Sequence, residues 1–373
     1  MKVFKTVVLI MLVCLTFTGC NSQNNLRDLS IVEGMGIDYT DGETEVTVQT
    51  LNLVKEGSGS EALSQNVTIN TSDSGNNISD ALTNISKGIS KKLFFGQNRI
   101  IVFGKDFATN HLYENLDYLL RSSDSRADIL LCVADDTAKS VIDSKENNAL
   151  VPAESIASLL ITGEKRGFSA RVTTNELLNL YADKTSDMYL PVVKCEKDNI
   201  AVLGIAIYDN DKLVSILGDD DMKGLLFLKD KIKSGLVMVE TTNLGKTTVE
   251  ITKSYSKSKV KYENGKITLY ETIKANVTLN EAEKGIIEPV TDEDINEIKK
   301  LTEKEIEKSC TSAFNECVKH KSDCLRLGEN LAMRDPRAYA VLSENWDDHL
   351  KDAQIKIDVD CSISKINEHS QKN

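Results

Sequence analysis

Residues 86–104 read SKGISKKLFFGQNRIIVFG, and their pattern is typical of a corner between a helix and a strand. Lys87, Lys91 and Lys92 place positive charge where a helix would end, which suits the negative end of the helix dipole. Two aromatic residues and a glycine follow, and residues 99–104 then favour a buried strand. We interpret the segment as a structural corner, and a surface on which a partner docks is the alternative.

Strands and helices alternate on both sides of this corner. Upstream, residues 31–39 and 43–54 are strand-like, and Asp41-Gly42 between them is a strong hairpin signal. The apolar residues of segment 76–89 recur at helical spacing. Downstream, the pattern predicts a helix over 106–121, a strand over 128–134, helices that begin at Pro152 and at Thr173 or Thr174, and a strand over 189–193.

After the charged segment of residues 196–199, the chain becomes rich in strand-like patterns. Asn210-Asp211 and Asn264-Gly265 are expected hairpin turns. From Asp292 an apolar stripe at helical spacing continues through Cys324, so we expect one helix of more than thirty residues. The other predicted elements are strands over 201–208 and 212–217, a helix over 219–228, strands over 235–241, 246–257 and 259–279, and a last strand over 355–363.

These patterns predict an α+β protein of several domains, in which mixed β-sheets are flanked by α-helices and a long C-terminal helix is followed by a terminal strand. The length of 373 residues also favours two or three compact units. We expect a signal peptide over 1–19, a lipidated cysteine and tether over 20–25, an N-terminal α/β domain over 26–200 that could contain two subdomains, a C-terminal α+β domain over 201–366, and a polar tail over 367–373.

The first twenty residues predict export and lipidation. Lys2 and Lys5 precede an apolar run that ends at Phe17, which is too short to span a bilayer and is typical of a secretory signal. Thr18-Gly19-Cys20 then matches the end of a bacterial lipobox, in which the cysteine thiol accepts a diacylglyceryl group. We expect Cys20 to be the lipidation site and the membrane tether, with an ordinary cleaved signal and a chance cysteine as the alternative.

Charge and histidine placement exclude several kinds of partner. The net charge is −12, and an acidic surface repels phosphate, so we expect no nucleic-acid binding and no binding of anionic lipid through the body of the protein. His111, His320, His349 and His369 are isolated in the sequence, and none belongs to a zinc motif. We therefore expect no metal site.

The sequence contains no convincing catalytic or phosphate-binding motif. Gly34-Met35-Gly36 resembles part of a phosphate-binding loop, but the third glycine is missing, so we expect a close approach of this strand to its neighbours instead. Asp219-Asp220-Asp221 and Asp347-Asp348 suit helix starts and solvated faces better than acid–base catalysis. The sequence contains no Gly-x-Ser-x-Gly nucleophile elbow. We expect a non-catalytic protein without a cofactor.

The cysteines apart from Cys20 are widely spaced. On one helix, Cys310, Cys317 and Cys324 would share a face at intervals of about 10 Å, which is too far apart for disulfide bonds. We expect them to be small apolar residues of the core, and disulfide bonds in an exported protein are the alternative. The six cysteines expected in the mature chain besides Cys20 are Cys132, Cys195, Cys310, Cys317, Cys324 and Cys361.

Several segments together resemble one known family. Residues 31–38, IVEGMGID, and the corner at 86–104 are similar to the spore germination receptor C subunits, the Ger(x)C lipoproteins of endospore-forming bacteria. Further resemblance spans the chain, in Leu116-Asp117-Tyr118 with Arg121 and Arg126, in Gly204-Ile205-Ala206, and in residues 323–329, DCLRLGE, with Pro336 and Trp346.

The resemblance implies an α+β protein held by a lipid on the outer face of the spore inner membrane. It implies two integral membrane partners, the A and B subunits of a receptor that starts germination in response to nutrients, and no enzymatic role or cofactor. It carries over no ligand-binding residue, so Cys20 is the one site residue we name. The alternatives are a solute-binding lipoprotein of an uptake system, a secreted hydrolase and a structural coat component.

Overall fold

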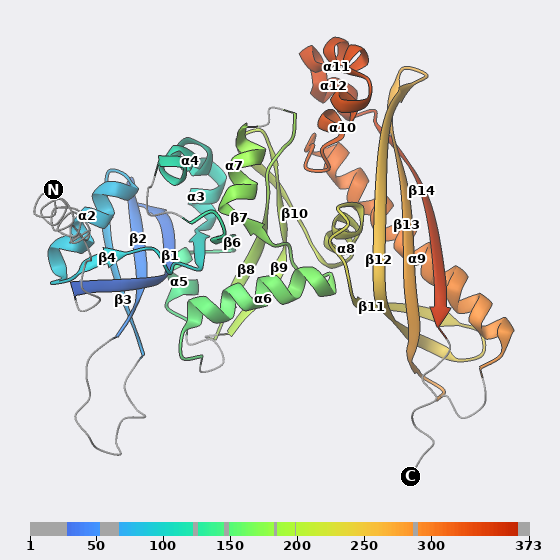
Figure 1. Cartoon of the computed structure of the whole chain (residues 1–373), viewed down its shortest axis with the longest axis horizontal. Helices are drawn as coiled ribbons and strands as arrows, with labels where there is room; N and C mark the ends of the chain where they lie inside the picture. The colour runs from blue at the N-terminus through green and yellow to red at the C-terminus, as the bar shows by residue number, and fades with distance from the viewer. Residues whose placement is uncertain are drawn as a thin grey trace, which may run out of the picture.

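The chain folds around two β-sheets, seen in the computed structural model of Figure 1. Helices flank both sheets, and the long C-terminal helix is followed by a terminal strand, so the predicted α+β class with mixed sheets is confirmed. The structure describes residues 28–52, 67–121, 126–144, 149–182, 185–197, 199–285 and 290–364.

The larger sheet is parallel at its centre and antiparallel at its sides. β1, β5, β6 and β8 are parallel neighbours, β2 and β3 extend the sheet beyond β1, and β9 and β10 extend it beyond β8. The predicted turn at Asp41-Gly42 joins β1 to β2, and both residues have positive φ. The strands are β1 (Leu29–Thr40), β2 (Glu43–Leu51), β3 (Thr68–Gly75), β4 (Lys92–Phe94), β5 (Ile100–Phe103), β6 (Leu130–Ala134), β7 (Val172–Thr173), β8 (Tyr189–Glu196), β9 (Asn199–Asp209) and β10 (Lys212–Leu217).

Helices cover both faces of the larger sheet, because its central strands are apolar on both sides. Ile100 and Val102 of β5 belong to the core under α5 and α6, whereas Ile101 and Phe103 face the other way, into the core that contains residues of α2, α3, α4 and α7. The predicted helix over 106–121 is divided at His111, and α5 was not predicted. The helices are α2 (Ile78–Gly88), α3 (Lys105–Asn110), α4 (Leu112–Arg121), α5 (Ala138–Ile142), α6 (Pro152–Arg166) and α7 (Thr174–Ala182).

The smaller sheet has the strand order β11-β12-β13-β14, and α9 lies along it (Figure 1). β13 and β14 are parallel and the other pairs antiparallel. The predicted strand break after Lys257 is wrong, because β12 continues to the turn at Asn264-Gly265. The elements are α8 (Asp219–Leu228), β11 (Gly235–Thr241), β12 (Gly245–Glu263), β13 (Lys266–Ala282), α9 (Asp292–Lys319), α10 (Leu327–Arg334), α11 (Pro336–Leu342), η3 (Ser343–Asn345), α12 (Trp346–Leu350) and β14 (Gln354–Ser364).

The expected helix of more than thirty residues is wrong, because α9 has 28 residues and ends at Lys319. Its end is a Schellman turn: the Ser322 amide donates to the Cys317 carbonyl at 2.9 Å, and the Lys321 amide donates to the Val318 carbonyl at 3.1 Å. Lys321 holds the left-handed position, with φ 57°, that glycine usually takes. No glycine marks this helix end in the sequence, so the pattern predicted no stop, and Cys324 lies beyond the helix.

The predicted boundary at residues 200 and 201 falls inside β9, which pairs with β8 of the larger sheet. After β10 the chain enters α8, and α8 packs on α9 at Gly224, where a Cβ atom would lie 2.0 Å from the Ser309 carbonyl oxygen. The division into an N-terminal and a C-terminal domain stays a prediction.

Candidate functional site

The predicted lipidation site, Cys20, lies outside the described residues, and so do the predicted signal peptide and the polar tail. Lipidation therefore stays a prediction. Within the described ranges, no helix combines the length and the apolar composition that crossing a membrane requires.

The segment 31–38 and the corner at 86–104 meet through Glu33 and Arg99. The Arg99 amide donates to the Glu33 carbonyl at 2.9 Å, and the Arg99 Nε lies 3.2 Å from Glu33 Oε2. Burial raises the pKa of Glu33, and the Arg99 guanidinium opposes this rise. A second carboxylate, that of Glu154 on α6, lies 3.5 Å from Arg99. Arg99, which directly precedes β5, thus connects this strand to β1 and to α6.

Gly34 and Gly36 allow two helices to approach β1 closely. A Cβ atom at Gly34 would lie 2.6 Å from Ala153 Cβ on α6, and one at Gly36 would lie 3.2 Å from Ala138 Cβ on α5. The predicted close approach of this strand is confirmed, and the absence of a helix directly after the glycines explains why they form no phosphate loop.

Asp38 ends the same segment and binds α5. Its two carboxylate oxygens accept hydrogen bonds from the amides of Ala138, at 2.7 Å, and Lys139, at 2.9 Å. Burial raises the pKa of Asp38, and these two amide bonds oppose the rise. The family-like segments therefore hold the sheet and its helices together, which supports the interpretation of the corner as structural. Phe94 on β4 is partly exposed there, and docking on it is untested.

A polar cleft of about 700 Å³ lies where the two sheets meet. We call it the junction cleft. Lys231 spans it, with its Nζ 3.5 Å from Glu164 and 3.9 Å from Glu176. The Tyr189 hydroxyl donates to Glu176 at 2.6 Å. The cleft is lined by Thr173, Asn175, Glu176, Asn179, Leu180, Tyr189, Leu228, Lys229, Asp230, Lys231, Ser256, Ser258, Leu325 and Arg326.

Lys229 is one of the residues that line the junction cleft. Its Nζ donates to the Cys324 carbonyl at 2.7 Å and lies 4.1 Å from the centre of the Tyr189 ring. Burial lowers the pKa of Lys229. Because its amine is held by a carbonyl and an aromatic face, Lys229 joins the segment after α9 to β8, and it is not placed as a free nucleophile.

Glu271 on β13 is the buried acid behind this cleft. Burial raises the pKa of Glu271 to about 7. The Ser258 hydroxyl donates to its Oε2 at 2.5 Å, while Glu271 Oε1 and Ser256 Oγ have no hydrogen-bond partner among the described residues. Sequence reasoning missed Glu271, because it occupies one of several polar positions in an alternating strand.

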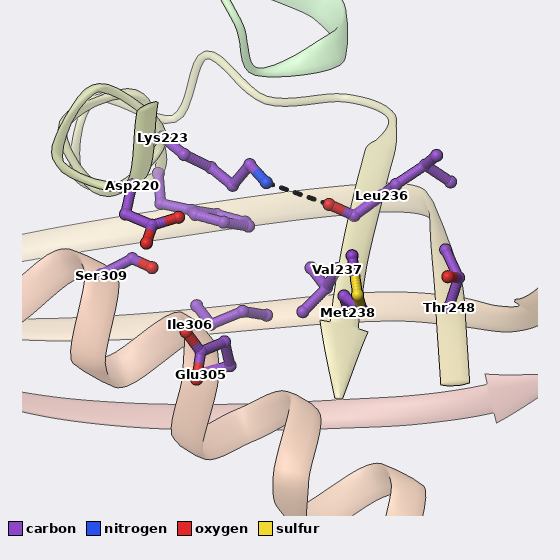
Figure 2. A pocket seen from close by; sticks show the side chains of 10 residues that line it. Asp220, Lys223, Leu236, Val237, Met238, Thr248, Glu305, Ile306 and Ser309 are labelled. Atoms are coloured by element: carbon purple, nitrogen blue, oxygen red, sulfur yellow. Dashed lines mark hydrogen bonds between the residues drawn. The ribbon is translucent and has the colours of Figure 1, made fainter. Parts of the chain in front are cut away.

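A second pocket, of about 450 Å³, lies between α8, α9 and β11 (Figure 2). Lys223 reaches over it, and its Nζ donates to the Leu236 carbonyl at 3.0 Å on the edge strand β11. Met238 on the same strand is 65% exposed. The pocket is lined by Asp220, Lys223, Phe227, Leu236, Val237, Met238, Thr248, Glu305, Ile306 and Ser309.

The three histidines within the described residues belong to different parts of the fold. His111 packs against Tyr39 in a tilted arrangement with ring centres 3.8 Å apart, His320 follows α9, and His349 is in α12, while His369 lies outside the described residues. Among the described residues, no three His, Cys, Asp or Glu side chains are grouped so that they could hold a metal ion.

Comparison with known proteins identifies the fold and the family. Residues 22–195 match the spore germination protein N-terminal domain, and residues 203–367 match the spore germination B3/GerAC-like C-terminal domain. Spore germination protein B3 of Bacillus subtilis is 22% identical over 94% of this chain and 94% of its own length. Spore germination protein GerQC of Bacillus cereus is 22% identical over 96% of this chain and 98% of its own length.

A solved structure has the same fold. The crystal structure of the GerBC protein superposes with a TM-score of 0.59 and 20% sequence identity, covering 88% of this chain and 96% of the GerBC chain. Two family models in sequence order, full-length relatives and a shared fold lead to one conclusion. The chain belongs to the Ger(x)C family of spore germination proteins.

Proposed function

We propose that the chain is the lipid-anchored, non-catalytic C subunit of a nutrient germinant receptor on the outer face of the spore inner membrane. The observation that carries this proposal is the pair of family matches, which together extend from residue 22 to residue 367. The first match begins just after Thr18-Gly19-Cys20, where the lipobox places the start of the mature chain.

The membrane attachment follows from the chemistry of a lipidated cysteine. Each buried CH₂ group of an acyl chain contributes about 0.8 kcal/mol to membrane binding, so two or three acyl chains on Cys20 hold the protein firmly. The polar residues 21–25 would then act as a short tether between the lipid and β1.

The non-catalytic role is supported by the partners of the partly buried charged groups at the junction cleft. Lys229, Lys231 and Glu176 are each engaged by a neighbouring side chain or carbonyl at the junction cleft. Such groups hold segments together rather than being presented to a substrate. We propose the A and B integral membrane subunits as partners, since the receptor has to cross the membrane.

We also propose the division into an N-terminal domain over 26–200 and a C-terminal domain over 201–366. The interval between the two family matches, residues 196–202, supports this division. The pairing of β8 with β9 carries the larger sheet across the boundary, so the two domains would share a rigid junction.

Co-purification from spores tests the receptor role. The tagged full-length protein is isolated from detergent-solubilised spore membranes, and its companions are identified by mass spectrometry. Two multi-span membrane subunits are expected with the wild-type protein and are expected to be lost with the Cys20→Ser variant, which serves as the matched control. Recovery of an ABC-type permease instead would contradict the receptor role.

A solute-binding lipoprotein is the second candidate, and the junction cleft of about 700 Å³ is the observation that favours it. A ligand present at 100 times its Kd stabilises a protein by about 2.7 kcal/mol. Thermal unfolding of the purified protein with panels of amino acids and sugars would reveal such binding. Rising Tm with one solute class, abolished by Glu176→Gln, would favour this candidate.

A further inference from the structure

Cys317 and Cys324 are in contact, contrary to the expectation from the sequence. Their Sγ atoms lie 3.5 Å apart, and both side chains are buried. The expected separation of about 10 Å assumed one continuous helix. Because α9 ends at Lys319, the chain returns over its own last turn and brings Cys324 back onto Cys317.

The return of the chain is fixed by backbone geometry and by one carboxylate. Lys321 and Arg326 both have positive φ, 57° and 62°, and they bracket the segment that carries Cys324. The Asp323 carboxylate accepts the amides of Leu327 at 2.6 Å and Gly328 at 2.7 Å, which begins α10. The thiol contact is therefore part of a closed turn.

The two thiols differ in their surroundings. The hydrogen bond with the Cys317 thiol lowers the pKa of Cys324, and the positive charge of Lys229, whose Nζ binds the Cys324 carbonyl, adds to this effect. The same contact and burial raise the pKa of Cys317. A pair with one thiolate-prone sulfur and one protonated sulfur beside it has the asymmetry on which thiol–disulfide exchange depends.

We propose that Cys317 and Cys324 form a dithiol–disulfide site that becomes oxidised in the exported protein. The Sγ atoms have to approach by only about 1.5 Å to reach bonding distance. Export belongs to the proposed function, and exported proteins meet conditions in which disulfides persist. The bond would close the turn of residues 317–324.

The chemistry balances with a disulfide oxidant, either a small-molecule disulfide or a thiol oxidoreductase. The Cys324 thiolate attacks one sulfur of the oxidant, forming a mixed disulfide and releasing one thiolate. Cys317 loses its proton, and its sulfur attacks Cys324 Sγ, which releases the second thiolate. The oxidant is reduced to two thiols, and two cysteine thiols become one disulfide. Both sulfurs are buried, so the first attack takes place before the turn closes or when it opens.

The bond would fasten the junction between the two sheets. The turn holds Asp323, whose amide donates to Asp187 Oδ2 at 2.6 Å ahead of β8, and it holds the Cys324 carbonyl that Lys229 binds at 2.7 Å. Linking the ends of this turn removes conformations in which these contacts are lost. We expect oxidation to stabilise the junction and with it the relative position of the two sheets.

A redox titration of the full-length protein in detergent tests the site. The protein is equilibrated with mixtures of oxidised and reduced dithiothreitol, quenched with acid, alkylated with N-ethylmaleimide in denaturant, digested and analysed by mass spectrometry. We expect a linked peptide pair containing Cys317 and Cys324, and alkylated Cys132 and Cys310. Oxidation should raise the Tm by roughly 5 °C, because a short loop is closed.

Two variants separate this site from general effects of oxidation. In Cys317→Ser the redox dependence of the Tm should vanish, whereas in Cys310→Ala, a change on the same helix, it should remain. Fluorescence of Trp346, the single tryptophan, follows the same transition close to the turn, since its ring lies beside Gly328. Loss of the redox dependence in Cys310→Ala but not in Cys317→Ser would overturn the proposal.

The same peptide analysis of acid-quenched spore membranes reports whether Cys317 and Cys324 are oxidised or reduced in spores. A linked pair supports the proposal, and free thiols at both positions, in spores or throughout the redox titration, overturn it. The titration does not depend on export or on the membrane partners. A protein that forms the bond in the titration but co-purifies with no membrane subunits would contradict the proposed receptor role and not the chemistry of this pair.

Discussion

The Asp38 carboxylate accepts a 2.7 Å hydrogen bond from the amide of Ala138, a residue 100 positions further along the chain. The bond joins the end of β1 to the first turn of α5, whose amides have no partner within the helix. Gly104 makes room for it, because a Cβ atom there would lie 1.9 Å from Asp38 Oδ1. A residue of the family-like segment thus accepts the first two amides of a helix that is distant in sequence, while Thr137, the N-cap residue of α5, accepts the amide of Ser140.

Replacing Asp38 should destabilise the larger sheet. Asp38→Ala leaves the amides of Ala138 and Lys139 without their acceptors in a buried setting, which costs about 2 kcal/mol or more. Thermal unfolding followed by circular dichroism should show a lower Tm. Asp38→Asn keeps one acceptor oxygen and should lose less. Equal Tm values for wild type and Asp38→Ala would contradict the role of Asp38 in holding α5.

Adding a methyl group at Gly34 should separate α6 from β1. In Gly34→Ala the new Cβ would lie 2.6 Å from Ala153 Cβ, so the helix has to move, at a cost of about 1–3 kcal/mol. Gly88→Ala is the matched control, since no atom lies within 4 Å of a Cβ there. We expect Gly34→Ala to lower the urea midpoint and Gly88→Ala to leave it unchanged or raise it. The reverse order of the two would refute this packing.

Glu271 should make stability depend on pH. Its pKa is raised by burial from 4.5 to about 7, so the folded state favours the protonated carboxyl. The stabilisation is complete below pH 4.5 and is lost as the pH rises through about 7, at a cost of up to about 3 kcal/mol. Glu271→Gln stays neutral. We expect wild type and Glu271→Gln to have similar Tm values at pH 5, and the variant to have the higher Tm at pH 8. A Tm difference between the two proteins that does not change with pH would count against this role of Glu271.

Cys20 should carry the lipid. We expect Cys20→Ser to incorporate no alkyne-labelled fatty acid and to leave the membrane fraction, because the lipid supplies the anchor. Cys14→Ser changes a cysteine inside the expected signal peptide and should keep both the label and the membrane association. A Cys20→Ser protein that stayed fully membrane-bound in cells without the A and B subunits would disprove the tether.

Local patterns in the sequence were enough to predict many elements. The turn at Asp41-Gly42 lies between β1 and β2, and α8 begins at Asp219 as its acidic first turn indicated. The alternation of residues 355–363 matches β14, in which alternate side chains are partly or fully buried. These features depend on residues close together in the chain, so periodicity and turn chemistry report them directly.

Short-range patterns in the sequence by themselves determined the turns and, taken in order, the α+β class. The lipobox at Cys20 is a pattern of the same kind, and lipidation there stays a prediction. The tertiary structure decided where α9 ends, which distant carboxylate binds the first amides of α5, and which cysteines meet. Lys321 adopts a left-handed conformation that its side chain disfavours, and the Asp323 amide donates to Asp187, a residue 136 positions away. Contacts between distant segments outweigh the local preference there, and no pattern within one segment contains them.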